Sequence, residues 1–474
     1  MCKTTVTIEE GTNGSVAAET TGQLTTGSVE WSLIKMTGAM MIGFVAGAAF
    51  NVTDTYFVSR LGTETLAAMA FTFPVVMVIF GVTMGIGIGV TAVISRAIGT
   101  GQTQRVQTLT WDALLLGVVC VGVFVAVGLG TMRPLFARMG ADETTLPLVI
   151  RYMRIWYLGM LFLVVPIIGN CAIRATGDML SPSLIMLADL GFNIVLDPLL
   201  IFGIGPFPEM GIEGAAIATV ASRAVALIAS LTVLHRKGLL RWRRPSGRRV
   251  LTSWNEVAYI GLPAGLANLA TPLAMGVVVR VASGVGTAAV AAVSAATRIE
   301  HVVVLPIFAL GAALIPFAGQ NLGAGRIERI QGAHKAANRL CLLWGLVCIV
   351  GFCLVRAPIA RAFTRDAAVY RYLLLYLTIV PFAFGVRGLS QSAASIMNGV
   401  HQPYHAAGAT FLRTLALQVP LVVVGGWLFG FVGLSCALVL TEFLAGGISV
   451  AWLRNLLARS VQPLSVVPAT PRSG

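Results

Sequence analysis

Charged side chains are scarce in this sequence, and their scarcity decides the class of protein. Only 11% of the 474 residues are charged and 57% are hydrophobic, whereas soluble domains carry about 25% charged residues. A soluble protein of this length would need far more polar surface to cover itself. The composition therefore excludes a soluble globular protein and places the chain in a lipid bilayer.

The sequence also lacks the motifs that most enzymes and ATP-driven pumps carry. It contains no nucleotide-binding loop, no cluster of metal ligands and no nucleophile triad. The glycine-rich stretch GVTMGIGIG (81–89) is no dinucleotide fingerprint, because no strand precedes it. Its small residues are spaced instead for close packing of membrane helices. We therefore expect no catalysis, no bound cofactor and no resident metal ion.

Long apolar runs dominate what the sequence does contain. A membrane-spanning helix needs about 20 apolar residues, and twelve such runs can be drawn along the chain. They are continuous and not alternating, which excludes a membrane β-barrel. The predicted fold class is an all-α polytopic membrane protein, with spans at about 33–59, 67–94, 109–132, 146–173, 183–204, 211–234, 254–283, 288–318, 336–357, 368–396, 405–427 and 431–454.

The few charges are mostly basic and lie between the apolar runs. The net charge is +14, which in a soluble protein would suggest nucleic acid. Here the loop after the sixth run holds seven Lys and Arg residues within 236–249 and no acid. Such residues act as topology signals and contact anionic lipid. The positive-inside rule then predicts cytoplasmic termini. We expect a monomer in the cell inner (plasma) membrane, in contact with lipid and not with nucleic acid.

The chain contains an internal repeat. At an offset of 224, AIGTGQTQRVQ (97–107) overlies NLGAGRIERIQ (321–331), so that Arg105 matches Arg329. Because six spans separate the repeated positions, both halves cross the membrane in the same direction, as in one common transporter plan. We therefore divide the chain into a disordered cytoplasmic tail (1–32), a first lobe (33–235), a basic linker (236–252), a second lobe (253–458) and a C-terminal tail (459–474).

Carboxylates at membrane depth are the strongest functional signal, because each costs about 2.5–3.5 kcal/mol to insert. Asp54 lies late in the first run. Asp197 lies in the fifth, one turn after Asn193 and on the same helix face. Counted from the helix ends, these residues share with Thr219 and Tyr152 one layer about 10 Å from the outer boundary. Two acids, an amide, a hydroxyl and a phenol at one level could bind a proton or a cation.

These residues also have purely structural interpretations. Asp54 and Asp197 could be satisfied structural carboxylates. Thr219 could bond back to a carbonyl of its own helix, and Tyr152 could anchor the chain at the membrane interface. For the two acids the repeat favours a function, because the equivalent positions in the second half are valines. We therefore assign ion coupling to the first lobe.

The apolar runs of the second half also contain charges, among them Arg298, Glu300 and Arg413. We expect the long side chain of Arg413 to extend toward the inner membrane interface. Glu300 lies near the middle of the membrane and has two interpretations. It is either half of a structural ion pair or a substrate contact in the cleft.

Five segments resemble the multidrug and toxic compound extrusion (MATE) family, and within it the DinF-like branch. In matching order and spacing they are NVTDTYFVSRLG (51–62), RATGD (174–178), NIVLDPLLIFG (193–203), GIEGAAIAT (211–219) and RIEHVVVLPIFALGAALIPFAGQNLGAGR (298–326). The resemblance covers about residues 33–455. It implies twelve helices in two lobes around a central cavity, and export of toxic organic compounds in exchange for H⁺ or Na⁺.

The resemblance also implies roles for single residues. It assigns ion coupling to Asp54, Asn193 and Asp197, with Thr219 and Tyr152 beside them. If the coupling ion is Na⁺, the first three and Thr219 would be its ligands. Asn170, just before RATGD, matches a family position that faces the cavity.

We therefore expect a secondary active multidrug efflux antiporter that works by alternating access. Its substrates would be small amphipathic or cationic molecules, with Asn170 and Glu300 as candidate contacts. Two other classes remain as alternatives. A flippase for a lipid-linked precursor would need a strongly basic cavity, and a non-transporting membrane receptor or scaffold would have no use for buried acids.

Overall fold

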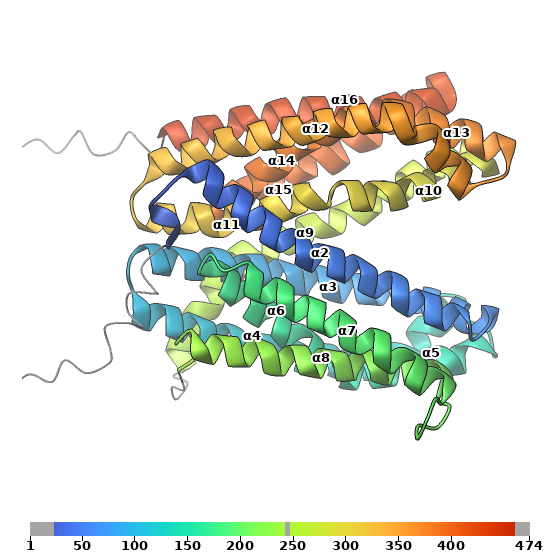
Figure 1. Cartoon of the computed structure of the whole chain (residues 1–474), viewed down its shortest axis with the longest axis horizontal. Helices are drawn as coiled ribbons and strands as arrows, with labels where there is room; N and C mark the ends of the chain where they lie inside the picture. The colour runs from blue at the N-terminus through green and yellow to red at the C-terminus, as the bar shows by residue number, and fades with distance from the viewer. Residues whose placement is uncertain (1–22, 242–246, 460–474) are drawn as a thin grey trace, which may run out of the picture.

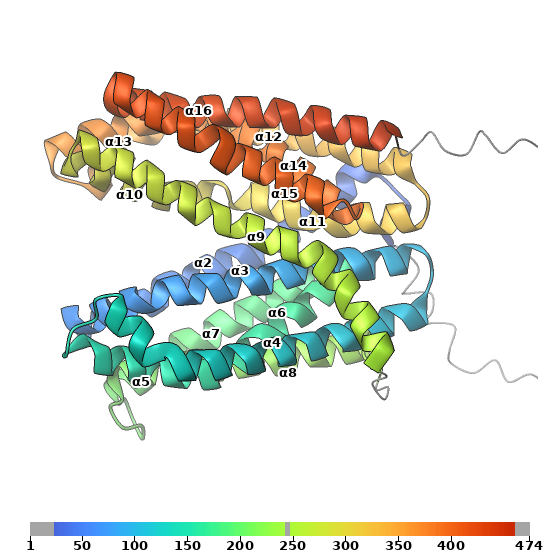
Figure 2. The same ribbon diagram turned by 180° about the vertical axis from the view of Figure 1, so that it is seen from behind.

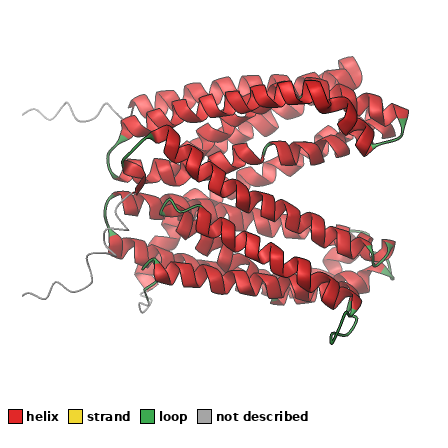
Figure 3. Ribbon diagram, in the orientation of Figure 1, coloured by secondary structure: helices red, strands yellow, loops and turns green. Residues whose placement is uncertain are grey.

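The computed structural model describes residues 23–241 and 247–459, and these residues form helices without any strand (Figure 3). A short 3₁₀ turn, η1 (Gln23–Thr25), precedes the first long helix. The first half of the chain then forms α2 (Val29–Ser59), α3 (Thr63–Gly99), α4 (Thr103–Arg138), α5 (Thr145–Leu158), α6 (Met160–Ala175), α7 (Leu180–Phe202) and α8 (Gly211–Arg236). The second half forms α9 (Gly247–Val285), α10 (Thr287–Val303), α11 (Leu305–Gly323), α12 (Ile327–Phe363), α13 (Ala367–Ile379), α14 (Pro381–Gly399), α15 (Pro403–Phe411), the π-helical segment η2 (Leu412–Gln418) and α16 (Val419–Arg459).

These helices make twelve membrane spans, as the apolar runs predicted. Nine stretches are long and apolar enough to cross a membrane, and two bent pairs add one span each. One of the nine, Pro403–Arg459, has 57 residues and would be about 85 Å long if straight, nearly three times the hydrocarbon core. The non-helical backbone at Gly430 (φ 57°) divides it into two. The predicted all-α fold of twelve transmembrane helices is confirmed.

Two of the predicted continuous spans are bent in the structure. The pair α5 and α6 meets at 47°, and the pair α13 and α14 meets at 51°. In the second pair the break falls at Pro381, the first residue of α14, where the missing N–H removes a helical hydrogen bond. In the first pair the break falls at Gly159, against which the side chain of Val220 packs.

The spans gather into two bundles, one of α2–α8 and one of α9–α16 (Figures 1 and 2). The bundles come together at the end of the molecule where the described chain begins and ends, here named the inner end. Toward the opposite, outer end the ribbons diverge.

Glycines allow the two bundles to touch at the inner end. A Cβ on Gly85 of α3 would lie 2.5 Å from the carbonyl oxygen of Gly261 and 2.7 Å from the Cα of Gly265, both on α9. Gly99, at the end of α3, lies equally tightly against the carbonyl of Gln320 on α11. In lipid, helix association depends on such van der Waals packing and not on a hydrophobic driving force. The glycine-rich stretch therefore packs helices closely, as its spacing predicted.

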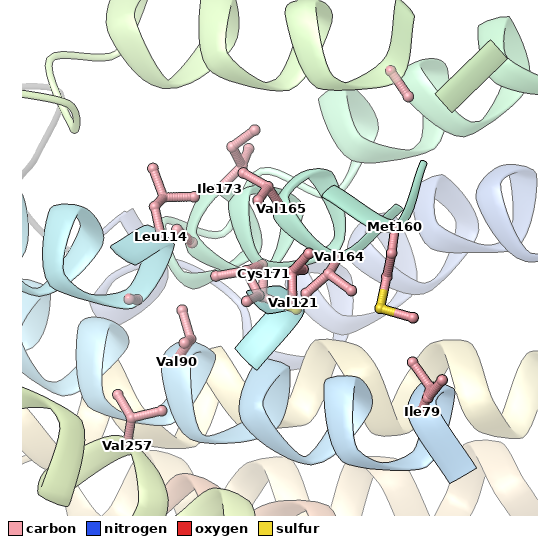
Figure 4. Close-up of a cluster of buried hydrophobic side chains, with 14 of the residues drawn as sticks. Ile79, Val90, Leu114, Val121, Met160, Val164, Val165, Cys171, Ile173 and Val257 are labelled. Carbon is pink, nitrogen blue, oxygen red and sulfur yellow. The ribbon is translucent and has the colours of Figure 1, made fainter. Parts of the chain in front are cut away.

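The clusters of buried apolar side chains also follow the division of the helices into two bundles. At the inner end, Val257 of α9 joins a cluster otherwise built largely from α3, α4 and α6 (Figure 4). Met36 and Met40 of α2 join a cluster of the second bundle that includes Phe317. The remaining three clusters each draw on a single bundle. The bundles are thus packed together at the inner end.

Arg105 and Arg329, which the internal repeat matches, bind equivalent segments in the two halves. Arg105 of α4 binds Glu256 near the start of α9, with an Nη2–Oε1 distance of 2.5 Å. Arg329 of α12 donates to the carbonyl oxygens of Leu24 and Gly27, just before α2, at 3.1 and 2.8 Å. In each half the arginine of the third span therefore holds the start of the first span of the other half.

Ten residues of the expected N-terminal tail, 23–32, lie in the described part of the chain. Residues 23–32 form η1 and the start of α2, because side chains of the second bundle satisfy their backbone groups. The Leu24 N–H donates to the Gln320 side chain, and the Leu24 carbonyl also accepts from Asn321. The Leu24 side chain is buried against Gly177 of the first bundle. Similarly, 247–252 of the expected linker are already helical in α9. Residues 1–22, 242–246 and 460–474 lie outside the described part.

A side chain at Gly85 should push the bundles apart. We expect Gly85→Val to lower the free energy of unfolding by about 1–3 kcal/mol through overpacking, because only backbone atoms of α9 face the new Cβ. The matched control is Gly122→Val on α4, where nothing lies within 4 Å of the new Cβ. Thermal unfolding of the purified proteins in detergent measures both. Equal losses for the two variants would contradict the close contact.

Candidate functional site

Helix α7 carries a polar stripe through the first bundle. Asp189, Asn193 and Asp197 follow one another at four-residue spacing, which places them on one helix face, and all three are buried. The Asn193 Nδ2 donates to Asp197 Oδ1 at 3.1 Å, which leaves the other oxygen of each side chain free. An amide and two acids at this depth are costly to bury unless they bind something.

Asp54 on α2 meets this stripe. Its side chain is only 9% exposed, and its carboxylate is close enough to that of Asp197 for the two to repel. Tyr152 on α5 is buried and interacts electrostatically with both carboxylates. The structure therefore brings Asp54, Asp197 and Tyr152 together, and Tyr152 faces the acids and not the membrane interface.

Helix α8 adds Thr219 at the same level. Two contacts fix the antiparallel alignment of α7 and α8: Gly214 packs on the Leu200 carbonyl, and Arg223 pairs with Asp189. Between these contacts Thr219 falls at the level of Asn193. Its buried Oγ1 makes no hydrogen bond within the described residues, so it does not bond back to its own helix.

Four oxygens are thus left over at one level of the first bundle. They are Asp54 Oδ1, Asn193 Oδ1, Asp197 Oδ2 and Thr219 Oγ1, each buried and without a hydrogen-bond partner among the described residues. Buried polar atoms are normally paired. Carboxylate, amide and hydroxyl oxygens are ligands for hard cations, and a carboxylate can bind a proton instead. The arrangement suits reversible binding of one small cation.

Asn170 does not belong to this group. Gly159 packs on Val220, and Gly169 packs on Ser230, so α6 and α8 run side by side in the same direction. Asn170 therefore lies about three helical turns, or roughly 16 Å, inward of Thr219. Its Oδ1 is buried and has no hydrogen-bond partner among the described residues.

Two charged residues beside the site were missed from the sequence. Asp189 and Arg223 form an ion pair at 2.5 Å, and the guanidinium of Arg223 stacks over the ring of Phe50 on α2, 4.4 Å from its centre. A signal was present, because Asp189 lies four residues before Asn193 and Arg223 lies four residues after Thr219. Extending the polar faces by one turn would have found both.

Two of the intramembrane charges named for the second bundle, Glu300 and Arg413, have partners of opposite charge. Glu300 of α10 accepts a hydrogen bond from the Tyr376 hydroxyl and lies 3.5 Å from Arg387 of α14. It therefore has the partners of a structural ion pair, the first of its two interpretations. Arg298, two residues earlier, is exposed.

The prediction for Arg413 was wrong. Its Nη1 lies 2.9 Å from Glu442 Oε1 on α16, and both side chains are nearly buried. A buried carboxylate on the neighbouring helix offers a stronger partner than a distant interface, because charges attract strongly where the dielectric is low. The pair sits at the π-helical segment η2, and such segments frequently mark functional sites.

Removing one member of this pair should harm the protein more than removing both. We expect Arg413→Met to cost about 3–5 kcal/mol of stability, because Glu442 would keep a buried and uncompensated charge. The double variant Arg413→Met, Glu442→Met should recover most of this loss. Thermal unfolding in detergent compares the three proteins. A double variant no more stable than the single one would mean that the pair is not a buried charge unit.

With the geometry established, comparison with known proteins identifies the family. The MatE family model matches residues 27–199 and 263–424. A protein of Shewanella oneidensis named "FAD transporter" is 38% identical over 417 residues, covering 87% of this chain and 92% of that protein. The "Multidrug export protein MepA" of Staphylococcus aureus is 24% identical and covers 85% of this chain and 89% of that protein.

The chain is also similar to solved structures of transporters. The Vibrio cholerae MATE transporter VcmN in its bent form superposes with a TM-score of 0.87 at 29% identity. The match covers 92% of this chain and 99% of that one. The relatives and structural neighbours are transporters and not enzymes. The chain belongs to the multidrug and toxic compound extrusion (MATE) family of membrane transporters.

Proposed function

We propose that this chain is a secondary active antiporter that exports organic compounds in exchange for H⁺ or Na⁺. One observation carries the proposal: the four buried oxygens of Asp54, Asn193, Asp197 and Thr219 have no hydrogen-bond partner among the described residues. If the coupling ion is Na⁺, these oxygens are its ligands. If it is H⁺, the two carboxylates bind it. Tyr152 closes the site from α5.

Binding of the ion changes the charge of the site. Two carboxylates that repel one another in a low dielectric favour uptake of a cation. With the ion bound, the repulsion between Asp54 and Asp197 is relieved, and α2 is free to change its path. The side chains of Asn51 and Thr55 already bond back to carbonyls of α2, at 2.9 and 2.8 Å, and such bonds favour helix bending.

Helix α2 is suited to transmit this change between the lobes. Its outer half carries Asp54 and packs against α7 and α8, whereas its inner half packs with Phe317 of α11. We infer that 33–235 and 253–458 move as two lobes, with the inner end toward the cytoplasm, as the basic loops indicate. One ion charge crossing 100 mV then supplies about 2.3 kcal/mol.

Neutralising either acid should abolish coupling. We expect Asp54→Asn and Asp197→Asn each to reduce ion-driven export at least about a hundredfold, because the site loses the charge that the ion compensates. The control is Asp142→Asn, since Asp142 lies in the outer loop and its carboxylate bonds, within the described part of the chain, only to the neighbouring residues Thr144 and Thr145. Export from proteoliposomes under an imposed pH gradient or an imposed Na⁺ gradient measures the effect and identifies the ion. Wild-type coupled export by both variants would disprove the site.

The substrates that we propose are small amphipathic or cationic compounds. The multidrug export function named for the Staphylococcus aureus relative supports this class, as does the acidic site of the first lobe. A second candidate is a flavin dinucleotide, because the Shewanella oneidensis relative is named a FAD transporter and its match is long. The exposed Arg298 of the second lobe is a suitable partner for its pyrophosphate.

The two candidates differ in charge and can be separated directly. Proteoliposomes loaded in parallel with ethidium, a fluorescent organic cation, and with FAD should export ethidium under the coupling gradient. Arg298→Gln should leave ethidium export within about twofold of the original protein, because removal of a cation does not weaken binding of another cation. Export of FAD with no export of ethidium would favour the flavin candidate, and Arg298→Gln should then lower FAD export.

A further inference from the structure

Arg223 introduces a positive charge where the coupling ion would bind. Its Nη1 pairs with Asp189 Oδ2 at 2.5 Å, while its guanidinium stacks on Phe50 at 4.4 Å. Phe50 lies one turn before Asp54 on the same face of α2. The guanidinium is therefore held between Asp189 on one side and the approach to Asp54 on the other.

Arg223 can still donate a hydrogen bond to a second partner. Its Nε is buried and has no hydrogen-bond partner among the described residues, and neither has Asp189 Oδ1. Arg223 also attracts Asp54 electrostatically from its present position. A flexible side chain with five N–H donors can exchange partners by rotation alone.

We propose that Arg223 is an exchangeable counter-ion for the coupling site. This inference rests on the proposed function. Asp189 holds the guanidinium away from Asp54 while the coupling ion is bound. When the ion leaves, the guanidinium turns toward Asp54 and partly compensates its charge, and the next ion displaces it back to Asp189. Arg223 is thus a positioning residue that acts through Asp54.

The charge balance of the site explains the need for such a group. Two ionisable groups on neighbouring helices interact with Arg223, namely Asp54 of α2 and Asp189 of α7. Asp54 in turn interacts with Asp197 of α7 and Tyr152 of α5. Three carboxylates and one guanidinium leave an excess of negative charge once the ion has gone. Without Arg223 the site would hold its ion too tightly to release it, because attraction at low dielectric is strong.

The two members of the pair should then respond in opposite directions. Asp189→Asn frees the guanidinium to stay near Asp54, where it competes with the ion. The Na⁺ or H⁺ concentration for half-maximal export should rise about tenfold. Arg223→Met removes the competitor, so that concentration should fall about tenfold while the maximal export rate also falls, because ion release becomes slow.

The measurement is export of ethidium and of FAD from proteoliposomes over a series of Na⁺ concentrations and a series of pH values. If protons drive export, Asp189→Asn needs a more acidic medium and Arg223→Met a less acidic one. A pair whose only role is to stabilise the fold predicts that both variants change in the same direction, since each breaks the same bond. Shifts of the same sign, or no shift in either variant, would overturn the proposal.

Controls separate folding from coupling. Arg223→Gln repeats the test with a polar side chain if Arg223→Met does not fold, and Arg223→Lys, which keeps the charge, should stay within about threefold of the original half-maximal concentration. Glu442→Gln and Arg413→Met break a buried pair in the other lobe and should not shift the half-maximal concentration in opposite directions. If no gradient drives export by the unaltered protein, the proposed function itself fails. If export is coupled but the opposite shifts are missing, only the role of Arg223 fails.

Discussion

Close contact between backbones at the inner end is the constraint on which this molecule depends. Lipid offers helices no hydrophobic reason to associate, so the lobes rely on surfaces that fit without side chains between them. Gly85, Gly261 and Gly265 provide such a surface between α3 and α9. Because the tight fit is concentrated at one end, the outer halves of the lobes are free to differ in chemistry. The first holds unpaired acids, and the second holds paired charges.

The two halves therefore share an architecture but not a chemistry. Each half has an arginine on its third span that binds the start of the opposite lobe, so this contact between the lobes occurs twice. The buried charges are not repeated. In the second lobe Glu300 and Arg413 are neutralised by partners on adjacent helices. In the first, Asp54 and Asp197 face one another with no cation directly bonded to either in the described residues. The ion site that we propose therefore lies in the first lobe.

Much of the fold was predictable because its signals are local. A run of 20 apolar residues specifies a span by itself, and four-residue spacing alone places Asn193 and Asp197 on one helix face. Depth in the membrane can also be counted residue by residue from the end of a helix. By this counting, residues from four helices were assigned to one layer.

What the sequence could not supply was the rotation of each helix against its neighbours. The pairing of Arg413 with Glu442 depends on how α16 faces η2, and the pairing of Arg223 with Asp189 depends on how α8 faces α7. The sequence of a single helix does not specify either rotation. The bends at Gly159 and Pro381 were missed for a related reason, since hydropathy continues unchanged through them. Residues 23–32 were expected to be disordered because their polar composition gave no sign of partners about 300 residues away.

The partners of residues 24–27 lie about 300 positions later in the chain, so these contacts can form only late in synthesis. The carbonyl of Leu24 is held by Arg329, 305 positions later in the chain. At about 5–20 residues per second, the ribosome needs roughly 15–60 s to make the residue that fixes the first described turn. During that interval α2 is already in the membrane, while its leading segment lacks its final contacts. The segment that leads into α2 is therefore among the last of the described parts to gain its contacts, because Gln320, Asn321 and Arg329 of the second lobe must be made first.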